Sequence, residues 1–399
     1  MPLSVGIIGC GTAGQAASVF LRSAGHDVTV YERAPELSAV GAGLLVQPTG
    51  QRVLHELGVG ERLGALASRV ERLLGTSPDG RRVLDISYAD LSPELVGWGL
   101  QRSAIHDALM DRMQEAGVIV RPGVCAVNTM HTVRGASFTD LNGETHGPFD
   151  LLIVADGARS VLRGRSGLSR RDRQYAWGAL WFIGETSEAI DPAVLRQHYG
   201  GTSRMLGFLP SGRAGDGAPE RVSLFWSVRI DRASMDSFDD LRAFKAEAIR
   251  LAPGVGPFLG QIRKPSQLIV APYRDAVMRP THAGRIVYLG DAAHAMSPQL
   301  GQGVNLALMD ARALANRLGG GGELSKSLAA YERDRRAHVR FYRLASRWLT
   351  PLFQSDADAL APMRDAVMER LCRIGYTRDE MLRSLCGAKT GVLPGDVVE

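Results

Sequence analysis

The spacing of hydrophobic residues near the N-terminus predicts a strand, a helix and a second strand. Residues 5–8 form a short apolar run, which indicates a buried strand. Apolar residues then recur at helical spacing, and Gly25 follows as a helix stop; they are Ala13, Ala17, Phe20, Leu21 and Ala24. Val28 and Val30 alternate with polar residues as in a strand. Residues 5–32 are therefore expected to form a βαβ unit.

The rest of the first half continues with mixed elements. The segments 73–74 and 83–86 flank Ser77-Pro78-Asp79-Gly80, a turn sequence that predicts a hairpin. Residues 105–113 have a helical pattern, and residues 148–155 form another buried strand.

The pattern changes between about residue 175 and residue 272. Strand-like apolar segments surround a predicted helix near 239–251, and large aromatic side chains gather among them. The segments are 179–183, 205–209, 222–230 and 268–271. This pattern predicts a separate sheet that covers a pocket. A buried strand returns at 286–290, and the chain is mostly helical after about residue 300.

Together these elements predict an α/β protein with interleaved parts. We expect a Rossmann-like nucleotide-binding domain over 1–72, 98–174 and 273–320. A mainly antiparallel sheet domain for substrate takes 73–97 and 175–272, and 321–399 forms a helical C-terminal region.

Composition narrows the class of protein. The formal charge of +5 comes from 47 basic and 42 acidic residues, a mild surplus that suits anionic cofactors and does not indicate nucleic-acid binding. The four cysteines lie far apart, so we expect neither disulfides nor a metal site, and a cytoplasmic location. No apolar stretch is long enough to span a bilayer, and the N-terminus begins a strand and not a signal peptide.

A glycine-rich turn follows the first predicted strand. Gly9-Cys10-Gly11-Thr12-Ala13-Gly14 matches the dinucleotide-binding fingerprint, in which the glycines permit a tight turn, close approach of a pyrophosphate, and helix–strand packing. Glu32 ends the second strand 18 residues after Gly14, where its carboxylate can accept hydrogen bonds from a ribose. The pattern predicts a nucleotide site without separating FAD from NAD.

Two later segments carry a resemblance to a known family. Residues 290–305, Gly-Asp-Ala-Ala-His-Ala-Met-Ser-Pro-Gln-Leu-Gly-Gln-Gly-Val-Asn, closely resemble the second FAD motif of class A flavoprotein monooxygenases, which have the para-hydroxybenzoate hydroxylase fold. Residues 155–160, Ala-Asp-Gly-Ala-Arg-Ser, resemble the Asp-Gly motif of that family. The resemblance covers essentially the whole chain and matches short members that lack a thioredoxin-like C-terminal domain.

The resemblance implies a set of FAD contacts. Arg102 resembles the family arginine near the FAD phosphate or ribityl chain, although a helix-start arginine on the surface is the alternative. The whole set comprises Gly9, Gly11, Thr12, Ala13, Gly14, Glu32, Arg33, Gly43, Leu44, Arg102, Asp156, Gly157, Gly290, Asp291, Gly301, Gly303, Val304 and Asn305. Pro298 is expected to shape the turn between flavin and substrate, as the one catalytic candidate.

The resemblance also implies the reaction. NAD(P)H would reduce FAD, and a flavin hydroperoxide formed with O₂ would hydroxylate a small aromatic or heteroaromatic substrate. We expect a monomer or a dimer. Six arginines between 159 and 173 either recognise NADPH phosphates or form a solvated basic loop.

Substrate contacts are expected beside the flavin, from Gln47 and the aromatic middle segment. The candidates are Gln47, Trp181, His198, Arg204, Phe208 and Trp226. His198 and Tyr199 either deprotonate the substrate or lie on a strand edge, and His294 is expected to pack or to form a local hydrogen bond.

Three other functions use the same FAD motifs. A flavin-dependent reductase or dehydrogenase is one, and a halogenase is another, although the Trp-x-Trp-x-x-Ile signature of halogenases is absent from the sequence. A catalytically silent FAD-binding scaffold is the third.

Overall fold

The first apolar run lies in a six-stranded sheet. The computed structural model describes residues 1–38 and 41–393. The strand order is β18-β19-β12-β1-β2-β8, and all neighbours are parallel except the β18–β19 pair. The strands are β1 (Ser4–Ile8), β2 (Asp27–Glu32), β8 (Ile119–Pro122), β12 (Leu151–Val154), β18 (His282–Ala283) and β19 (Ile286–Tyr288).

Each face of this sheet is covered, which explains why its strands are apolar on both sides. Val5 and Ile7 pack among the helices on one face, whereas Ile8 packs against a small sheet on the other. The helices are α1 (Thr12–Ser23), α4 (Arg102–Glu115) and α9 (Gly303–Gly319). The small sheet, which the sequence analysis did not predict, contains β9 (Ala126–Thr132), β10 (Gly135–Asp140) and β11 (Thr145–Phe149).

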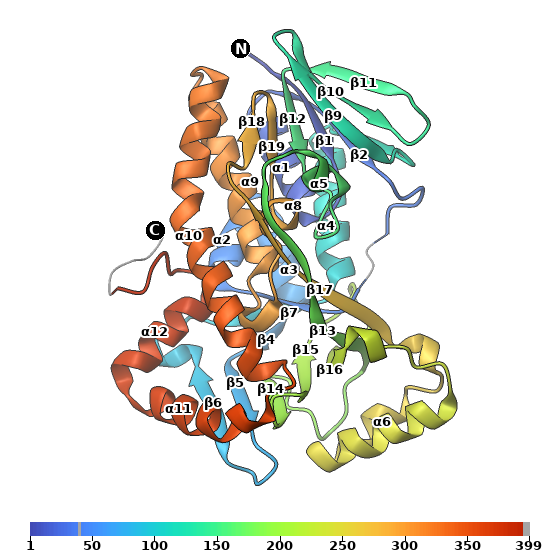
Figure 1. The fold of residues 1–399 in the computed structure, drawn as a ribbon, viewed down its shortest axis with the longest axis vertical. Helices are drawn as coiled ribbons and strands as arrows, with labels where there is room; N and C mark the ends of the chain where they lie inside the picture. Colours follow the sequence, from blue (N-terminus) through green and yellow to red (C-terminus); the bar gives the residue numbers. More distant parts are fainter. Residues whose placement is uncertain (39–40, 394–399) are drawn as a thin grey trace.

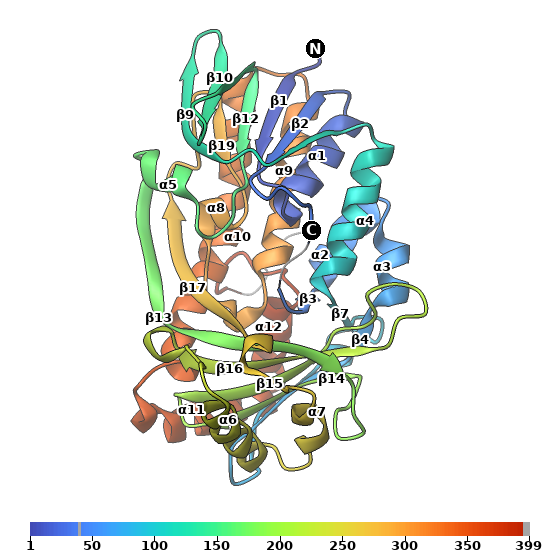
Figure 2. The ribbon, with the colours of Figure 1, turned by 90° about the vertical axis from the view of Figure 1, so that its right-hand side faces the viewer.

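A second large sheet has seven strands in the order β17-β13-β16-β15-β14-β5-β6. All its pairs are antiparallel except β14–β5, and the predicted hairpin supplies β5 and β6. The strands are β5 (Arg72–Thr76), β6 (Arg82–Ser87), β13 (Ser169–Glu185), β14 (Val194–Gly200), β15 (Arg204–Pro210), β16 (Arg221–Arg229) and β17 (Ile269–Met278). Figure 1 and Figure 2 show that the long strands β13 and β17 join the two halves of the molecule.

Different helices cover the two faces of the seven-stranded sheet. The outer face packs against α6 (Phe238–Leu251) and α7 (Gly256–Gly260). The inner face packs against the helical C-terminal region, in which α10 (Leu324–Phe353) is followed by α11 (Ala361–Arg373) and α12 (Gly375–Leu385). The predicted α/β class with an antiparallel sheet and a helical C-terminal region is confirmed.

Short elements connect these layers. A three-stranded sheet, ordered β3-β7-β4, lies beside the inner face of the large sheet. The remaining elements are β3 (Leu44–Val46), β4 (Ser68–Val70), β7 (Gly97–Leu100), α2 (Pro48–Glu56), α3 (Gly60–Leu66), α5 (Val161–Arg165), α8 (Asp291–His294), η1 (Tyr88–Asp90), η2 (Ile230–Arg232), η3 (Pro265–Gln267), η4 (Pro298–Leu300) and η5 (Asp358–Leu360). Over the described residues, none of the helices is both long and apolar enough to cross a membrane.

Candidate functional site

The predicted nucleotide-binding segments meet at one edge of the six-stranded sheet. The glycine-rich turn follows β1, Asp156 and Gly157 follow β12, and Asp291 follows β19. Because β1, β12 and β19 are parallel, their carboxyl ends lie side by side. This edge is where ligands bind in open α/β sheets.

The three glycines of the turn meet different surroundings. Gly9 has a φ of +104°, and a Cβ there would lie 2.4 Å from the carbonyl oxygen of Ala155. A Cβ on Gly14 would lie 2.0 Å from the carbonyl oxygen of Gly9. A Cβ on Gly11 would meet nothing within 4 Å. Gly9 and Gly14 are therefore required by packing, whereas Gly11 borders open space.

That open space lies at the N-terminus of α1. Gly11 is the N-cap residue, and no side chain caps the first turn, which begins at Thr12 and Ala13. The free N–H groups and the positive end of the helix dipole favour an anion such as a pyrophosphate. The site therefore fits the phosphates of a dinucleotide.

Glu32 lies beside the same turn. Its Oε2 accepts a hydrogen bond from the backbone N–H of Cys10 at 2.8 Å, and its Oε1 accepts one from Ala34 at 3.0 Å. Arg33, the next residue, is exposed. The two bonds orient the carboxylate and leave lone pairs for a ribose diol.

The segment after β12 holds a partly buried carboxyl group. Asp156 Oδ1 is buried without a hydrogen-bond partner among the described residues. Burial raises the pKa of Asp156, although Ser160 and nearby arginines oppose this shift. Gly157 has a φ of +82° and open space around it. A buried acceptor without a partner fits a ligand that donates a hydrogen bond at this point.

Arg163 is internal, which corrects both interpretations for this one of the six arginines that follow the Asp-Gly pair. Its side chain is fully buried and forms an ion pair with Asp172. It also donates to the backbone oxygens of Ala158, Asp291 and Ala292. Arg163 therefore joins the segment after β12 to the start of α8, and is neither a solvated loop residue nor available to a phosphate.

The segment after β19 begins at Gly290, with a φ of +57°. Its N–H donates to Asp310 Oδ2 at 3.0 Å, and His294 Nε2 lies 2.6 Å from the same oxygen. Burial opposes the charge on Asp310, but His294 and Arg335 hold its pKa well below its usual range. The local role expected for His294 agrees with this geometry.

Asp291 and the turn that follows it face open space. The Asp291 side chain is exposed, and within the described chain no hydrogen bond or ion pair engages its carboxylate. Pro298 is exposed in η4, and Gly301 has a φ of +63° with nothing near its Cβ position. The helix α9 starts at Gly303 without a side-chain cap. A free carboxylate beside an uncapped helix end fits the ribityl chain and ring of a flavin.

The first residues of α9 hold the loop before α2. Asn305 is buried, and its Oδ1 accepts a hydrogen bond from the backbone N–H of Gln47 at 2.9 Å. Val304, its neighbour, is partly buried. Gln47 is buried too; its Oε1 accepts from Tyr88 at 2.6 Å, and its Nε2 has no partner among the described residues.

Gly43 brings the same loop against the inner face of the seven-stranded sheet. Its N–H donates to Ser223 Oγ at 2.8 Å, and a Cβ there would clash with Ser211 and Ser223. Leu44 follows, partly buried. On the opposite side, a Cβ on Gly41 would lie 3.2 Å from Arg102 Nε, so the exposed Arg102 reaches this loop from the start of α4.

Four of the six expected substrate residues lie on the outer face of the seven-stranded sheet. Phe208 and Trp226 pack on the outer face, where Trp226 meets Phe244 of α6 with ring centroids 5.3 Å apart. Arg204 forms an ion pair with Glu247 of α6 and lies over the Trp226 ring. Alternation along β15 and β16 directs these side chains to the outer face, away from the flavin segments, which does not favour the expected contacts with substrate.

His198 is the fourth of the expected substrate residues on the outer face. Its Nδ1 lies 3.2 Å from Thr76 Oγ1, and its ring is 6.4 Å from that of Phe208 on the outer face. Burial, aided by Arg196, lowers its pKa to about 4. The strand β14 lies between β15 and β5 and is not an edge, so the strand-edge interpretation of His198 was wrong.

The inner face carries a different set of side chains. Trp181 was expected there, and its ring lies 5.2 Å from that of Phe225. Met205 belongs to the same cluster, together with Leu45 of the loop that Gly43 begins. The sequence analysis placed Phe225 only within the strand-like segment 222–230, because the register that separates it from Trp226 is not visible without strand pairing.

Tyr273 and Gln354 were missed. The Tyr273 hydroxyl contacts the side chains of Trp181 and Gln354, and burial raises its pKa, which keeps the phenol neutral. Gln354 also donates to Ser227 Oγ and contacts Gln299 of η4 at 2.7 Å. A polar chain therefore links the inner face to the turn beside Pro298. Gln354 ends α10 with no motif around it, and only the alternation of β17 could have indicated Tyr273.

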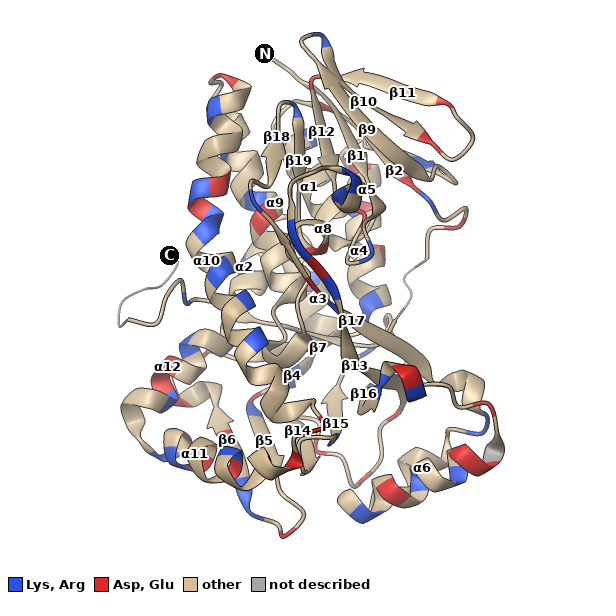
Figure 3. Ribbon diagram, in the orientation of Figure 1, with Lys and Arg blue, Asp and Glu red and all other residues tan. Residues whose placement is uncertain are grey.

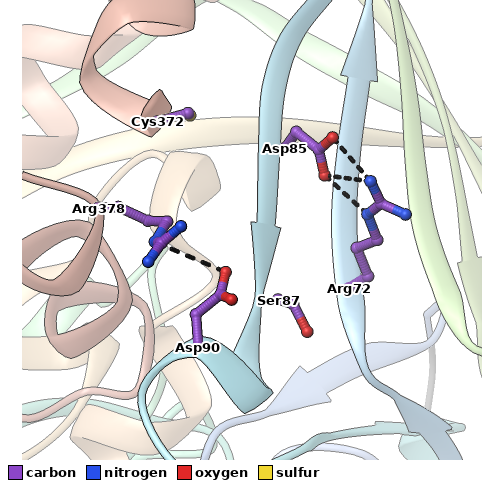
Figure 4. Close-up of a pocket in the computed structure, with 6 residues that line it drawn as sticks. All are labelled: Arg72, Asp85, Ser87, Asp90, Cys372 and Arg378. Carbon is purple, nitrogen blue, oxygen red and sulfur yellow. Dashed lines mark hydrogen bonds and ion pairs between the residues drawn. The ribbon is translucent and has the colours of Figure 1, made fainter. Parts of the chain in front are cut away.

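A polar cavity elsewhere is not part of this site. A cavity of about 330 Å³ is lined by residues of β5, β6, η1, α11 and α12. Figure 4 shows Arg72 paired with Asp85 and Arg378 facing Asp90 beside it. None of the predicted FAD residues lines it. A cluster of Asp140, Glu144 and His146 on β10 and β11 is also separate, and Asp140 there accepts backbone N–H groups of its own turn.

Comparison with known proteins decides the family. Residues 2–342 match the model of the FAD-binding domain family. The chain belongs to this family. It is a class A FAD-dependent monooxygenase, an oxidoreductase that resembles other FAD-dependent hydroxylases along nearly its whole length. NAD(P)H is the usual reductant of such enzymes.

Individual relatives are similar over most of both chains. The 3-amino-4-hydroxybenzoate 2-monooxygenase of Streptomyces cremeus is 29% identical over 373 residues, which cover 88% of each chain. An FAD-dependent urate hydroxylase of Klebsiella pneumoniae is 26% identical over 348 residues, covering 86% of this chain and 88% of the relative. The crystal structure of Klebsiella pneumoniae HpxO with FAD and uric acid has a TM-score of 0.80 at 22% identity, covering 96% of this monooxygenase and 97% of that chain.

Proposed function

We propose that FAD binds along the carboxyl edge of the six-stranded sheet. Gly11 and the start of α1 receive its pyrophosphate, and Glu32 accepts hydrogen bonds from its adenosine ribose. Asp291 and Arg102 hold the ribityl side. The observation that carries this assignment is the open space at Gly11, between two glycines that packing requires, together with the open space at Gly301. Bound FAD supplies the hydride acceptance and O₂ activation of the reaction.

The protein contributes orientation, electrostatics and a dry pocket. The uncapped start of α9 near Gly303 places the positive end of a helix dipole beside the flavin segments, where it stabilises negative charge. Asn305 fixes this helix end to the loop of Gln47. Pro298 and the neighbouring Gln299 form the turn that separates the flavin segments from the inner face of the large sheet.

We propose that the substrate is a small aromatic or heteroaromatic molecule held at the inner face. Trp181 and Phe225 supply flat apolar surfaces, which suit a planar ring. Gln47 Nε2 offers a buried donor that no described residue engages, and Tyr273 offers a neutral hydroxyl. The relatives named above act on an aminohydroxybenzoate and on urate, both planar rings with polar substituents.

This assignment also divides the chain. Residues 73–97 and 175–272 supply most of the substrate sheet, 1–72, 98–174 and 273–320 supply the FAD-binding part, and the described part of the C-terminal region, 321–393, closes the inner face. The four cysteines are all free thiols, which supports a cytoplasmic location.

A substrate screen tests the proposal. The FAD-loaded enzyme is mixed with NADPH or NADH, and aromatic and heteroaromatic acids and phenols are added one at a time. A true substrate accelerates NAD(P)H oxidation and yields a product heavier by one oxygen atom. The proposal fails if aliphatic compounds alone stimulate oxidation, or if no ring compound is hydroxylated.

A further inference from the structure

Five arginine side chains gather around the single carboxylate of Asp275. Asp275 lies on β17 and its side chain is 3% exposed. Arg171 of β13 donates to Asp275 through Nε. Arg347 of α10 donates to it through Nε at 3.0 Å and Nη2 at 2.9 Å. Both lone-pair regions of the carboxylate are therefore engaged by these two arginines.

The helix α10 adds two more arginines to the same place. Arg340, Arg343 and Arg347 recur at intervals of three and four residues, so they share one face of the helix. Figure 3 shows basic residues along α10 and on the β13–β17 strand pair beside it. Arg279, just after β17, completes the group, which we call the Arg343 cluster: Arg171, Asp275, Arg279, Arg340, Arg343 and Arg347.

Arg343 has an unused hydrogen-bond donor. Its Nε is buried and has no partner among the described residues. Burial lowers the pKa of Arg343, and the positive charges of Arg347, Arg340 and Arg279 lower it further, against the opposing pull of Asp275. The guanidinium is thus partly desolvated among like charges, which is an unfavourable environment without an anion.

The Arg343 cluster has a larger excess of positive over negative charge than the surroundings of other buried arginines. Within the described chain, Asp275 is the one carboxylate that pairs with any of these five arginines, and its ion-pair partners are Arg171 and Arg347. By contrast, Arg163 and Arg274 share Asp172 as a close partner, and Arg364 pairs with Asp365. The cluster therefore retains four positive charges without a counter-charge.

We propose that the Arg343 cluster binds a phosphate-type anion, at a site separate from the FAD segments. Guanidinium groups bind phosphate oxygens through paired N–H donors, and Arg343 Nε supplies a donor that the protein itself does not use. None of the cluster residues is among the residues assigned to FAD contacts. The phosphate comes either from a free inorganic species or from a phosphorylated nucleotide such as NADPH.

Calorimetric titration of the FAD-loaded enzyme with inorganic pyrophosphate tests the site. Ionic strength is held constant with chloride, so that a general salt effect is excluded. We expect saturable binding by the wild type and at least tenfold weaker binding by Arg343→Met. Arg340→Gln alters an exposed member of the cluster and should weaken binding without affecting the fold. Arg370→Gln, the same loss of charge on exposed α11, should leave binding unchanged.

Competition separates the two sources of phosphate. If NADPH but not NADH displaces pyrophosphate, the site takes a nucleotide phosphate; if neither does, it takes free phosphate species. Absence of pyrophosphate binding to the wild type, or equal binding by Arg343→Met and wild type, overturns the proposal. FAD content and substrate-stimulated NAD(P)H oxidation are measured on the same samples, so that failure of this site is distinguished from failure of the proposed monooxygenase function.

Discussion

Asn305 Oδ1 accepts a hydrogen bond from the backbone N–H of Gln47, which lies 258 residues earlier in the chain. The Asn305 Nδ2 donates to the carbonyl oxygen of Gly301 at 3.2 Å. One buried amide thus fixes the distance between the loop of Gln47 and the turn at Gly301. Both segments are assigned to the flavin, so the geometry of the site depends on this side chain.

Asn305→Ala should therefore weaken FAD binding and destabilise the fold. The loss of hydrogen bonds at a buried position typically costs about 1–3 kcal/mol, which corresponds to about 5-fold to 150-fold in an equilibrium constant. FAD affinity is measured by quenching of flavin fluorescence, and stability by urea unfolding. Asn316→Ala, on the exposed side of the same helix, is the control. If both variants bind FAD as the wild type does, Asn305 does not organise the site.

Gly11 and Gly14 should respond differently to the same substitution. Gly11→Ala should fold normally and bind FAD much more weakly, because its Cβ enters open space where the pyrophosphate is placed. Gly14→Ala should lower the unfolding free energy by about 1–3 kcal/mol, since its Cβ meets the Gly9 carbonyl oxygen. Urea unfolding of the FAD-free proteins and FAD titration separate the two effects. Equal stability loss in both variants would contradict this account of the turn.

The two faces of the large sheet should give opposite results in kinetics. Tyr273→Phe on the inner face should raise KM about threefold to tenfold, or raise the peroxide formed per NAD(P)H by the same factor. The FAD content should stay unchanged. Phe208→Ala on the outer face should cost about 3–5 kcal/mol of stability without changing the coupling of the folded enzyme. Peroxide yield per NAD(P)H is the measurement. Uncoupling by Phe208→Ala alone would place the substrate on the outer face.

Because His338 is buried, we expect the protein to lose stability as the pH falls. Its side chain is fully buried between Arg335 and the carbonyl oxygen of Gly387, and burial, followed by Arg335, lowers its pKa to about 3. In the unfolded chain, His338 titrates near pH 6.5. The buried neutral His338 therefore stabilises the fold fully above that pH, and this stabilisation falls as the pH drops toward 3. Titration of His338 changes the unfolding free energy by up to about 1.4 kcal/mol per pH unit in this range. His338→Gln should remove this part of the slope in urea unfolding between pH 6.5 and 4, and an unchanged slope would show that His338 is not buried in its neutral form.

Much of the structure of the nucleotide-binding part of the molecule can be predicted from local sequence. The apolar run of residues 5–8, the glycines that follow and Glu32 all lie within one βαβ unit, so short-range spacing defines their geometry. The segment from Gly290 to Asn305 carries its turn residues in order. These positions need no knowledge of distant contacts.

The substrate half depends on pairing that local sequence does not contain. Phe225 and Trp226 are neighbours in the chain, yet they face opposite sides of the sheet. Which side meets the flavin is decided by the contact of Gly43 with Ser223, across 180 residues. Gln354 reaches the inner face from the end of the C-terminal helix α10. Arg163 of α5 donates to the backbone oxygens of Asp291 and Ala292, which lie 128 and 129 residues later. Long-range packing therefore determines the pocket, and the sequence alone could not assign it.

Oxygen transfer from labelled O₂ tests the central claim most directly. The FAD-loaded enzyme is supplied with NAD(P)H, isotopically labelled O₂ and the ring compound that most strongly stimulates NAD(P)H oxidation. Mass spectrometry then measures label in the product. The account predicts one labelled oxygen atom per molecule of hydroxylated product, with NAD(P)H consumed at least in equal amount. A protein that does not retain FAD, or a product whose new oxygen comes from water, would contradict it.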